Sequence, residues 1–262
     1  MAHTLYDNFV LANEIEDQYN SHLDLMRFCT IDNTLTGVAG MVKKINVYRA
    51  TDGTEKLTMG KGNTKDIEVS YTPEEYRILM AQNRFKYFDE QEMVDPMVVT
   101  TGVRHMATDM FNHVNADIFA EFGKATLSVA LNGADYFGAF VDASAALNVE
   151  NVEGIEKFAF VSNVDMAKIR KAMKDDLKYV SEFARHGYVG SIGDWNLYVK
   201  KDATVGTILG GTREAVTLFN KLGVEVEQDR DGDIRQNTIW SRKYYLAALT
   251  DATKAVRITL GA

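Results

Sequence analysis

The sequence predicts an α+β protein, on the basis of three patterns that follow one another along its 262 residues. Residues 42–72 alternate apolar and polar positions on either side of a glycine-containing stretch, which is typical of a long hairpin. Residues 96–124 place apolar side chains three or four positions apart, which predicts a long helix. From residue 130 onward, short strand-like and helix-like segments are mixed. We see no linker, so we expect one large domain or two intertwined subdomains.

The chain begins with a segment that predicts an extended arm. Residues 4–29 favour a partly amphipathic helix, and residues 30–41 are polar and contain glycine, so they are predicted to be a connector. Cys29 is the single cysteine, which excludes an intrachain disulfide and fits a reducing compartment. It follows a run of apolar residues, so we expect a buried thiol rather than a catalytic thiolate.

The hairpin pattern comes next. Ile45 and Val47 alternate with polar residues, as do Ile67 and Val69, and we expect a flexible tip at 51–63. A two-stranded hairpin is marginally stable alone in water, and this one has too few apolar residues for a core of its own. The hairpin is therefore expected to lie against another structure, such as a second subunit.

The clearest pattern in the chain is the predicted helix at 96–124. Asp95 precedes Pro96, which suits a helix N-cap followed by a first-turn proline. At ~1.5 Å per residue the helix would be about 40 Å long. The apolar stripe is interpreted as core packing, and it comprises Val99, Val103, Met106, Met110, Val114, Ile118 and Phe122.

The C-terminal half predicts several further elements. Strands are expected at 157–162, 195–201, 238–251 and 254–260, and helices at 165–173 and 213–223. Gly223 is interpreted as the residue that closes the second of these helices. The glycine-rich stretch 206–215 before it is expected to be a flexible loop with a helix cap at Thr212, because it lacks the pattern of a nucleotide-binding loop.

Composition excludes some classes of function. Hydrophobic residues make up 46% and charged residues 25% of the chain, which is typical of a folded soluble protein. The net charge is −8 and the pI is about 5.2, which argues against a basic nucleic-acid-binding surface. The sequence begins without a signal-peptide pattern, and no apolar run is long enough to span a membrane.

The acidic segment "EQDRDGDIRQN" at 227–237 resembles a calcium-binding loop. In the best register Asp229 and Asp231 occupy ligand positions, but the last position, which should be a bidentate glutamate, is Thr238. The flanking segments also favour strands instead of helices. We therefore interpret the segment as a solvated turn between strands.

No other pattern names a chemical reaction. His105 and His113 are eight positions apart on the predicted helix, too far for a local metal pair, so we expect surface or interface roles. Asp175 and Asp176 lie beside lysines and are interpreted as a solvated face. The sequence therefore predicts no catalytic residue, no metal site and no cofactor, and the protein is expected not to be an enzyme.

The order of elements, together with "GSIGDWNLYVKKD" and the segment from "REAVTLFNKLG" to "KAVRITL", resembles the tailed-bacteriophage major capsid protein with the Hong Kong 97-type fold. The resemblance covers nearly the whole chain. It implies an N-terminal arm at 1–41, an extended loop at 42–72, a peripheral domain with a spine helix at 73–129 and 226–262, and an axial domain at 130–225.

The resemblance also implies function and partners. We expect a subunit that assembles into the pentamers and hexamers of an icosahedral shell, with a separate scaffolding protein and a portal. The shell would enclose DNA without sequence-specific binding and without a membrane, in a virion assembled in the host cytoplasm. The extended loop would contact a neighbouring subunit, with no cross-link predicted, through Arg49, Thr54, Lys56, Lys61 and Lys65.

Two alternatives stay open at this point. A nanocompartment shell similar to the encapsulins would share the fold but enclose a protein cargo. An α+β enzyme with an unrecognised site would need a pocket with convergent polar groups.

Overall fold

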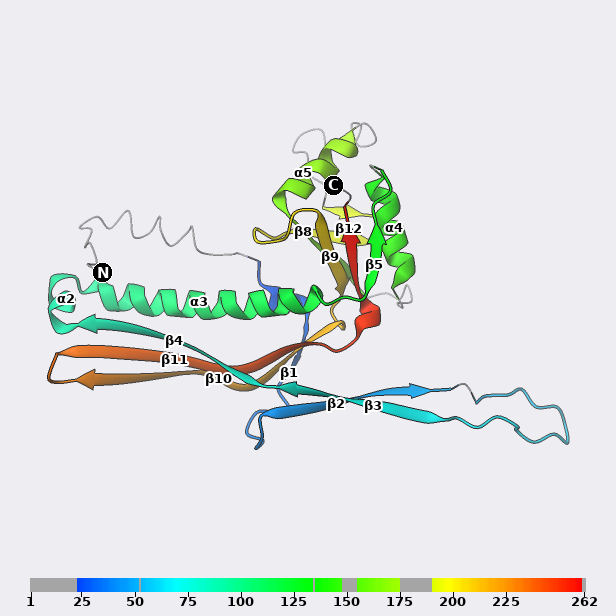
Figure 1. Ribbon diagram of the computed structural model, residues 1–262, viewed down its shortest axis with the longest axis horizontal. Coiled ribbons are helices and arrows are strands. Elements are labelled where there is room, and N and C mark those ends of the chain that lie inside the picture. Colours follow the sequence, from blue (N-terminus) through cyan, green and yellow to red (C-terminus); the bar gives the residue numbers. More distant parts are fainter. Residues whose placement is uncertain (1–22, 52, 134, 148–154, 175–189, 261–262) are drawn as a thin grey trace.

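A computed structural model describes residues 23–51, 53–133, 135–147, 155–174 and 190–260, with only the backbone described at 45–50 and 71–74. The described residues form three sheets with helices packed around them, so the predicted α+β class is confirmed (Figure 1). A long four-stranded sheet lies under one long helix. A six-stranded sheet stands over one end of that layer, and a two-stranded hairpin projects beyond it. Residues 1–22 of the expected arm, and the pair Asp175 and Asp176, lie outside the described residues.

The four-stranded sheet has the order β1-β10-β11-β4. Its strands are β1 (Thr30–Asp32), β4 (Leu79–Phe88), β10 (Val216–Asp231) and β11 (Gln236–Leu249). β10 and β11 form an antiparallel pair along most of their length, and β4 joins the far side of β11. A short 3-10 helix, η1 (Leu25–Phe28), leads into β1, which runs parallel to β10. The strand predicted at 238–251 is confirmed as β11.

The helix predicted at 213–223 is wrong, because this segment begins β10. Val216 and Leu218 are buried and Thr217 between them is partly exposed, which is the two-residue period of a strand. Pairing with β11 supplies partners that an isolated helix would lack, so tertiary context overrides local propensity. Gly223, interpreted as a helix end, lies where the register between β10 and β11 shifts at a bulge.

The predicted long helix is confirmed as α3 (Met97–Phe122). The helix begins one residue later than expected, with Pro96 and not Asp95 at the N-cap position. The Asp95 carboxylate still accepts a hydrogen bond of 2.9 Å from the backbone N–H of Met97, a first-turn donor. The C-terminal part of the predicted stripe is buried: Met106, Met110, Val114, Ile118 and Phe122. A short helix, α2 (Asp89–Val94), joins β4 to α3 at the far end of the molecule (Figure 1).

The six-stranded sheet has the order β5-β12-β9-β6-β8-β7. Its strands are β5 (Leu127–Ala130), β6 (Lys157–Val161), β7 (Ser191–Ile192), β8 (Trp195–Val199), β9 (Thr207–Thr212) and β12 (Ala255–Thr259). Two helices pack on it, α4 (Tyr136–Ala146) and α5 (Asn163–Ala172). The predicted strands at 157–162, 195–201 and 254–260 and the helix at 165–173 are thereby confirmed.

The glycine-rich stretch 206–215 was expected to be a loop, and that expectation is wrong for 207–212, which forms β9. Thr212 ends this strand instead of capping a helix. The glycines serve packing: a Cβ on Gly210 would lie 2.7 Å from the Trp195 ring, and one on Gly211 would lie 2.5 Å from the Lys254 carbonyl oxygen. Side-chain-free positions therefore allow β9 to pack closely against its neighbours.

The core consists mainly of two buried clusters. One lies within the six-stranded sheet and its helices, around Trp195 and Phe140. The other joins that sheet to α3 and the start of the four-stranded sheet, through Phe122, Phe158 and Leu218 among others. Cys29 belongs to the second cluster and is fully buried, which confirms the prediction of a buried thiol. Burial raises the pKa of this thiol to about 11.

The predicted hairpin is confirmed as β2 (Val42–Ala50) and β3 (Val69–Arg77), which pair only with each other. Residues 51–68 between them form no strand among the part of the tip that is described. At the base of the hairpin the Ile78 N–H donates to the Met41 carbonyl, which extends the pairing of its two sides. The Tyr76 hydroxyl donates to the Leu249 carbonyl in β11 and so joins the hairpin to the body.

Two strands cross the boundaries of the five ranges expected for the four domains. β10 begins within 130–225 but belongs to the four-stranded sheet. β12 lies within 226–262 but pairs with β5 and β9 in the six-stranded sheet. The chain therefore crosses between the two sheets more often than a division into continuous segments implies.

Candidate functional site

The five residues expected to contact another subunit lie on the β2–β3 hairpin. Thr54, Lys56, Lys61 and Lys65 are exposed on the tip, far from α3 and the two larger sheets (Figure 1). Arg49 lies in β2, where its backbone is opposite Ser70 in the register. The structure thus places all five on one projecting element.

Hydrogen bonds within the tip give it shape. The Glu55 carboxylate accepts hydrogen bonds from the Thr64 hydroxyl at 2.9 Å and from the Thr64 backbone N–H at 3.1 Å. The Asn63 side chain donates to the Gly53 carbonyl at 3.0 Å. These contacts cross the tip from one side to the other, so they hold its two sides together without contact with the body.

Exposed apolar side chains lie on the same projection. Met59 is fully exposed, at 106%, and Leu57, Ile67 and Val69 are each more than half exposed. Apolar side chains gathered on an element with no core are typical of an interaction surface. The hairpin therefore carries both cations and exposed apolar groups.

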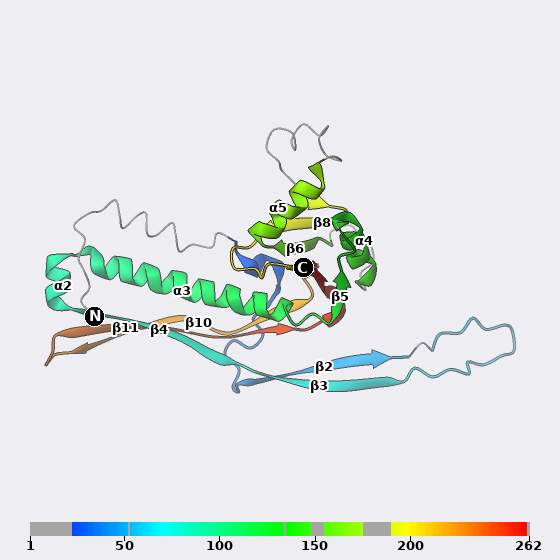
Figure 2. The ribbon, with the colours of Figure 1, turned by 45° about the horizontal axis from the view of Figure 1, so that its top comes forward.

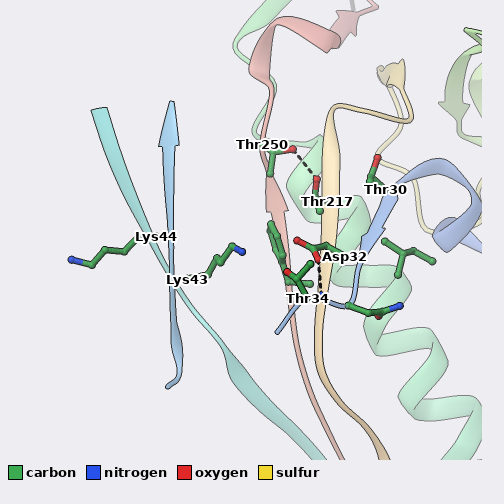
Figure 3. Close-up of a pocket in the computed structure, with 10 residues that line it drawn as sticks. Thr30, Asp32, Thr34, Lys43, Lys44, Thr217 and Thr250 are labelled. Carbon is green, nitrogen blue, oxygen red and sulfur yellow. Dashed lines mark hydrogen bonds between the residues drawn. The ribbon is translucent and has the colours of Figure 1, made fainter. Parts of the chain in front are cut away.

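A broad groove of about 920 Å³ separates the base of the hairpin from β1 and β10 (Figure 3). Lys43 points from β2 toward this groove, and its ammonium lies 5.4 Å from the centre of the Phe219 ring, a cation–π distance. Lys44 points the other way and pairs with Glu75 at 2.6 Å. Alternate residues of β2 therefore face the body and the hairpin's outer side, as a strand requires.

Asp32 is the carboxylate that faces this groove. The Thr34 backbone N–H donates to it at 2.8 Å. Slight burial opposes ionisation, but hydrogen bonds from Thr34 and the charge of Lys43 outweigh it, so the pKa of Asp32 lies below its usual value. An ionised carboxylate between a lysine and threonines gives no nucleophile with an adjacent base. The groove is best described as the space between the base of the hairpin and the body.

The acidic segment 227–237 closes the β10–β11 hairpin at the opposite end of the molecule (Figures 1 and 2). The interpretation as a turn between strands is confirmed, and Arg235 in the turn has a positive φ of 52°. The arginines of this segment form ion pairs with α2. Arg230 pairs with Asp89 at 2.7 Å, and Arg235 pairs with Glu90 at 3.0 Å. Asn237 also donates to Asp89 at 2.7 Å.

These contacts bind the turn to the first turn of α2, where carboxylates are favoured by the helix dipole. The sequence alone did not predict these contacts, because the partners are more than 140 positions apart in the chain. The cluster of acids in residues 89–95 was the signal that could have found them. Within the described parts of the chain, no three His, Cys, Asp or Glu side chains are grouped as metal ligands.

The closest approach to a catalytic constellation lies at the edge of the six-stranded sheet. Lys157 pairs with Asp194 and donates to the Ser144 hydroxyl at 3.3 Å. Ser144 donates to Asp194 at 2.6 Å and accepts from the Trp195 indole at 2.8 Å. The pKa of Asp194 is lowered, because hydrogen bonds from Lys157 and Ser144 outweigh its partial burial. Each polar group of this cluster already has a hydrogen-bond or ion-pair partner within it. The cluster therefore links α4, β6 and β8.

The two helix histidines have surface positions, as expected. His105 is exposed, and His113 lies 3.4 Å from both Asp117 and the Tyr245 hydroxyl. Tyr245 donates to Asp117 at 2.6 Å, and burial together with this carboxylate raises the pKa of Tyr245. This contact joins α3 to β11. Of the helices that the structure describes, none is long and apolar enough to cross a bilayer.

Comparison with known proteins gives a result only at the level of structure. No protein-family model and no curated protein matches the sequence. Among solved structures, the capsid of a native GTA particle matches all of this chain and 94% of its own, with a TM-score of 0.72 and 13% identity. The mature capsid of bacteriophage PhiM1 matches 99% of this chain and 89% of its own, with a TM-score of 0.69 and 9% identity.

The capsid of cyanophage P-SCSP1u is similar over 89% of this chain and 86% of its own, with a TM-score of 0.69 and 10% identity. The chain has the fold of these capsid proteins. The matches to the GTA and PhiM1 capsids extend over nearly the whole of this chain. The resemblance found in the sequence is therefore confirmed for the fold.

Proposed function

We propose that this chain is a major capsid protein that assembles into an icosahedral shell enclosing a viral genome. The observation that carries the proposal is the hairpin: it projects from the body, has no core, and exposes apolar side chains such as Met59 and Leu57. A projection of this kind is stabilised when another copy covers it. The capsid-like fold supports the same conclusion.

We propose two domains on this basis. The four-stranded sheet with α3 would be the peripheral domain, built mainly from 73–129 and the strands β10 and β11. The six-stranded sheet with α4 and α5 would be the axial domain. The contact residues of the extended loop would be Arg49, Thr54, Lys56, Lys61 and Lys65, and a role for them in packing against a neighbour stays a proposal.

The proposed partners follow from the same role. Copies of the chain would form pentamers and hexamers, with a separate scaffolding protein and a portal, and assembly would take place in the host cytoplasm. The net charge of −8 suits a container wall that repels packaged DNA instead of binding it. The protein would have a structural role and no catalytic residue.

Electron microscopy of the purified full chain, alone and with its scaffolding partner, tests the proposal directly. The expected result is closed shells of uniform size. Small soluble species under all of these conditions would contradict it. Shells that carry a protein cargo and never nucleic acid, when isolated from infected or expressing cells, would favour the nanocompartment alternative.

Deletion of residues 51–63 tests the role of the hairpin tip. Because the tip makes its hydrogen bonds within itself, the shortened subunit is expected to keep its fold, measured as an unchanged urea midpoint. Stable shells should be lost. Normal shells from the shortened chain would show that the loop does not interlock subunits.

A further inference from the structure

The β2–β3 hairpin is joined to the body by two chain segments of different kinds. On one side β3 continues into β4 through a single residue, Ile78, which is buried at 2% exposure. On the other side β1 is followed by residues 33–41, which lead into β2 and which we call the connector. Every residue from 36 to 42 is exposed, so this part of the connector gains little stability from packing of its own side chains.

The backbone of the connector leaves its path open as well. Gly37 and Gly40 have positive φ values of 76° and 108°, a conformation that glycine adopts without strain. A Cβ at either position would have no atom within 4 Å, so neither glycine is packed against the body. One short turn shapes the segment, where the Thr36 N–H donates to the Asn33 carbonyl at 3.1 Å. The direction of the connector therefore depends on contacts that another part of the chain supplies.

These contacts come from β10, at a point where its pairing with β11 is irregular. The register shifts between Asn220 and Leu222, which leaves Lys221 as the extra residue of a bulge. The Lys221 ammonium donates to the Val38 carbonyl at 2.6 Å and also to the Gly40 carbonyl. One cation thus binds two carbonyl oxygens of the connector, and we call this pair of hydrogen bonds the connector contact.

The connector contact is the strongest link between the connector and the body. Among the described residues, the Lys221 ammonium has hydrogen bonds only to these two carbonyls. The neighbouring bonds join neutral groups: the Asn220 amide donates to the Asn33 side chain at 3.0 Å, and the Thr36 hydroxyl donates to the Asn220 carbonyl at 3.5 Å. Hydrogen bonds from an ionised donor are stronger than those between neutral groups.

The side-chain contacts of the hairpin base with the body are long. The Tyr76 hydroxyl donates to the Leu249 carbonyl at 3.4 Å, which is longer than usual for such a bond. Lys43 lies 5.4 Å from the centre of the Phe219 ring, across the open groove (Figure 3). Ile78 is the buried anchor on the β3 side. The hairpin is therefore free to change direction about Ile78 unless the connector is held.

We propose that Lys221 is a positioning residue, which binds the connector and so sets the direction in which the β2–β3 hairpin leaves the body. The connector contact acts within one chain, before a second copy is present. In the proposed capsid role the hairpin meets another subunit, and a preset direction reduces the conformational entropy lost on assembly. The advantage for assembly rests on the proposed function, whereas the connector contact itself is a property of the single subunit.

Distances between spin labels in the unassembled chain test the connector contact. Glu68→Cys places one label just before β3, and Asp142→Cys places the other on α4. Both positions are exposed and Cys29 is buried, so the reagent labels the two new thiols. Double electron–electron resonance should give one narrow distance distribution for this labelled chain. Adding Lys221→Met, which keeps a long side chain without its donors, should broaden the distribution about twofold or more.

Two further variants of the labelled chain serve as controls. Lys44→Met removes a lysine of the same hairpin, which pairs with Glu75 and points away from the body, so the distribution should stay narrow (Figure 3). Lys221→Arg keeps a cationic donor at the bulge and should also keep the distribution narrow. Every variant should retain the urea midpoint of the labelled chain, because the connector contact holds an exposed segment and not the core.

The first set of outcomes concerns the single subunit. A distribution for Lys221→Met as narrow as that of the labelled chain would overturn the proposal and leave the capsid role intact. Equal broadening in Lys44→Met would also overturn it, because any change in the hairpin would then have the same effect. Loss of the folded state in Lys221→Met would count against it too, since Lys221 would then support the body and not the direction of the hairpin.

The second set of outcomes concerns assembly. Lys221→Met should form shells only at a protein concentration about tenfold higher than the unchanged chain requires, whereas Lys221→Arg should assemble nearly as well as that chain. Shells at an unchanged concentration, from a Lys221→Met chain with a broadened distribution, would overturn the advantage for assembly. Failure of the unchanged chain to form any shells would overturn the capsid role, while the spin-label distances would still decide the role of Lys221.

Discussion

The six-stranded sheet and the β2–β3 hairpin differ in how they are stabilised. All five residues of β6 are buried, whereas every residue from Lys56 to Ser70 on the hairpin is exposed. Burial of apolar surface contributes roughly 25 cal/mol per Å², so the sheet gains stability from its own core. The hairpin gains little in this way and is held by its ladder and its base. We expect the body to fold alone, and in the proposed shell a second copy would cover the apolar groups of the hairpin.

The largest expected difference between the two regions concerns Trp195. Its ring is fully buried, and its indole N–H donates to the Phe140 carbonyl at 2.9 Å. Trp195→Ala should lower the free energy of unfolding of the unassembled chain by about 3–5 kcal/mol, measured by urea denaturation. Leu57→Ala on the hairpin should change it by less than about 0.5 kcal/mol. Similar losses for both variants would show that the hairpin belongs to the cooperative core.

Thiol chemistry gives the next largest difference. Cys29 is fully buried with a pKa of about 11, so little thiolate exists at pH 8, whereas a cysteine at position 61 would have an ordinary pKa and be exposed. In the variant Lys61→Cys, a thiol reagent should modify the new cysteine at least about 100-fold faster than Cys29. The chain without the substitution gives the modification rate of Cys29 alone. Unfolding in urea should abolish the difference between the rates of the two thiols. Equal rates in the folded chain would contradict the burial of Cys29.

The sequence predicted best those elements whose signal is local. The helix α3 repeats its apolar stripe over many turns, and β6 is a short apolar run after Lys157, so both were found from the local sequence. The segment at 213–223 was mistaken for a helix, because its strand identity depends on β11, which lies about thirty positions later in the chain. β9 was mistaken for a loop, because its glycines are explained only by Trp195 and the Lys254 backbone packing against them.

The candidate contact surfaces were also predicted only where their signal is local in the sequence. The hairpin was recognised as an element that needs a partner, since its lack of apolar residues is visible in the sequence. The pairing of Arg230 and Arg235 with α2 was not predicted, because the partners are separated by more than 140 positions.

The smallest expected difference is in the effect on stability of one added methyl group, which reports how tightly each region is packed. A Cβ at Gly211 in β9 would lie 2.5 Å from the Lys254 carbonyl oxygen, and this backbone atom is fixed by the pairing of β9 with β12. Gly211→Ala should therefore destabilise the chain by about 1–3 kcal/mol. At Gly62 on the hairpin tip, a Cβ would have no atom within 4 Å and φ is not positive, so the methyl group meets open space.

Gly62→Ala should leave the free energy of unfolding unchanged or raise it by less than about 1 kcal/mol, since alanine restricts the unfolded chain. Both variants are compared by urea denaturation of the unassembled chain, where the hairpin is uncovered. A loss at Gly62 equal to that at Gly211 would mean that the tip packs tightly within a single subunit. Tolerance of Gly62→Ala in the free subunit, combined with weaker shells, would instead place the tight packing at the tip in the contact between subunits.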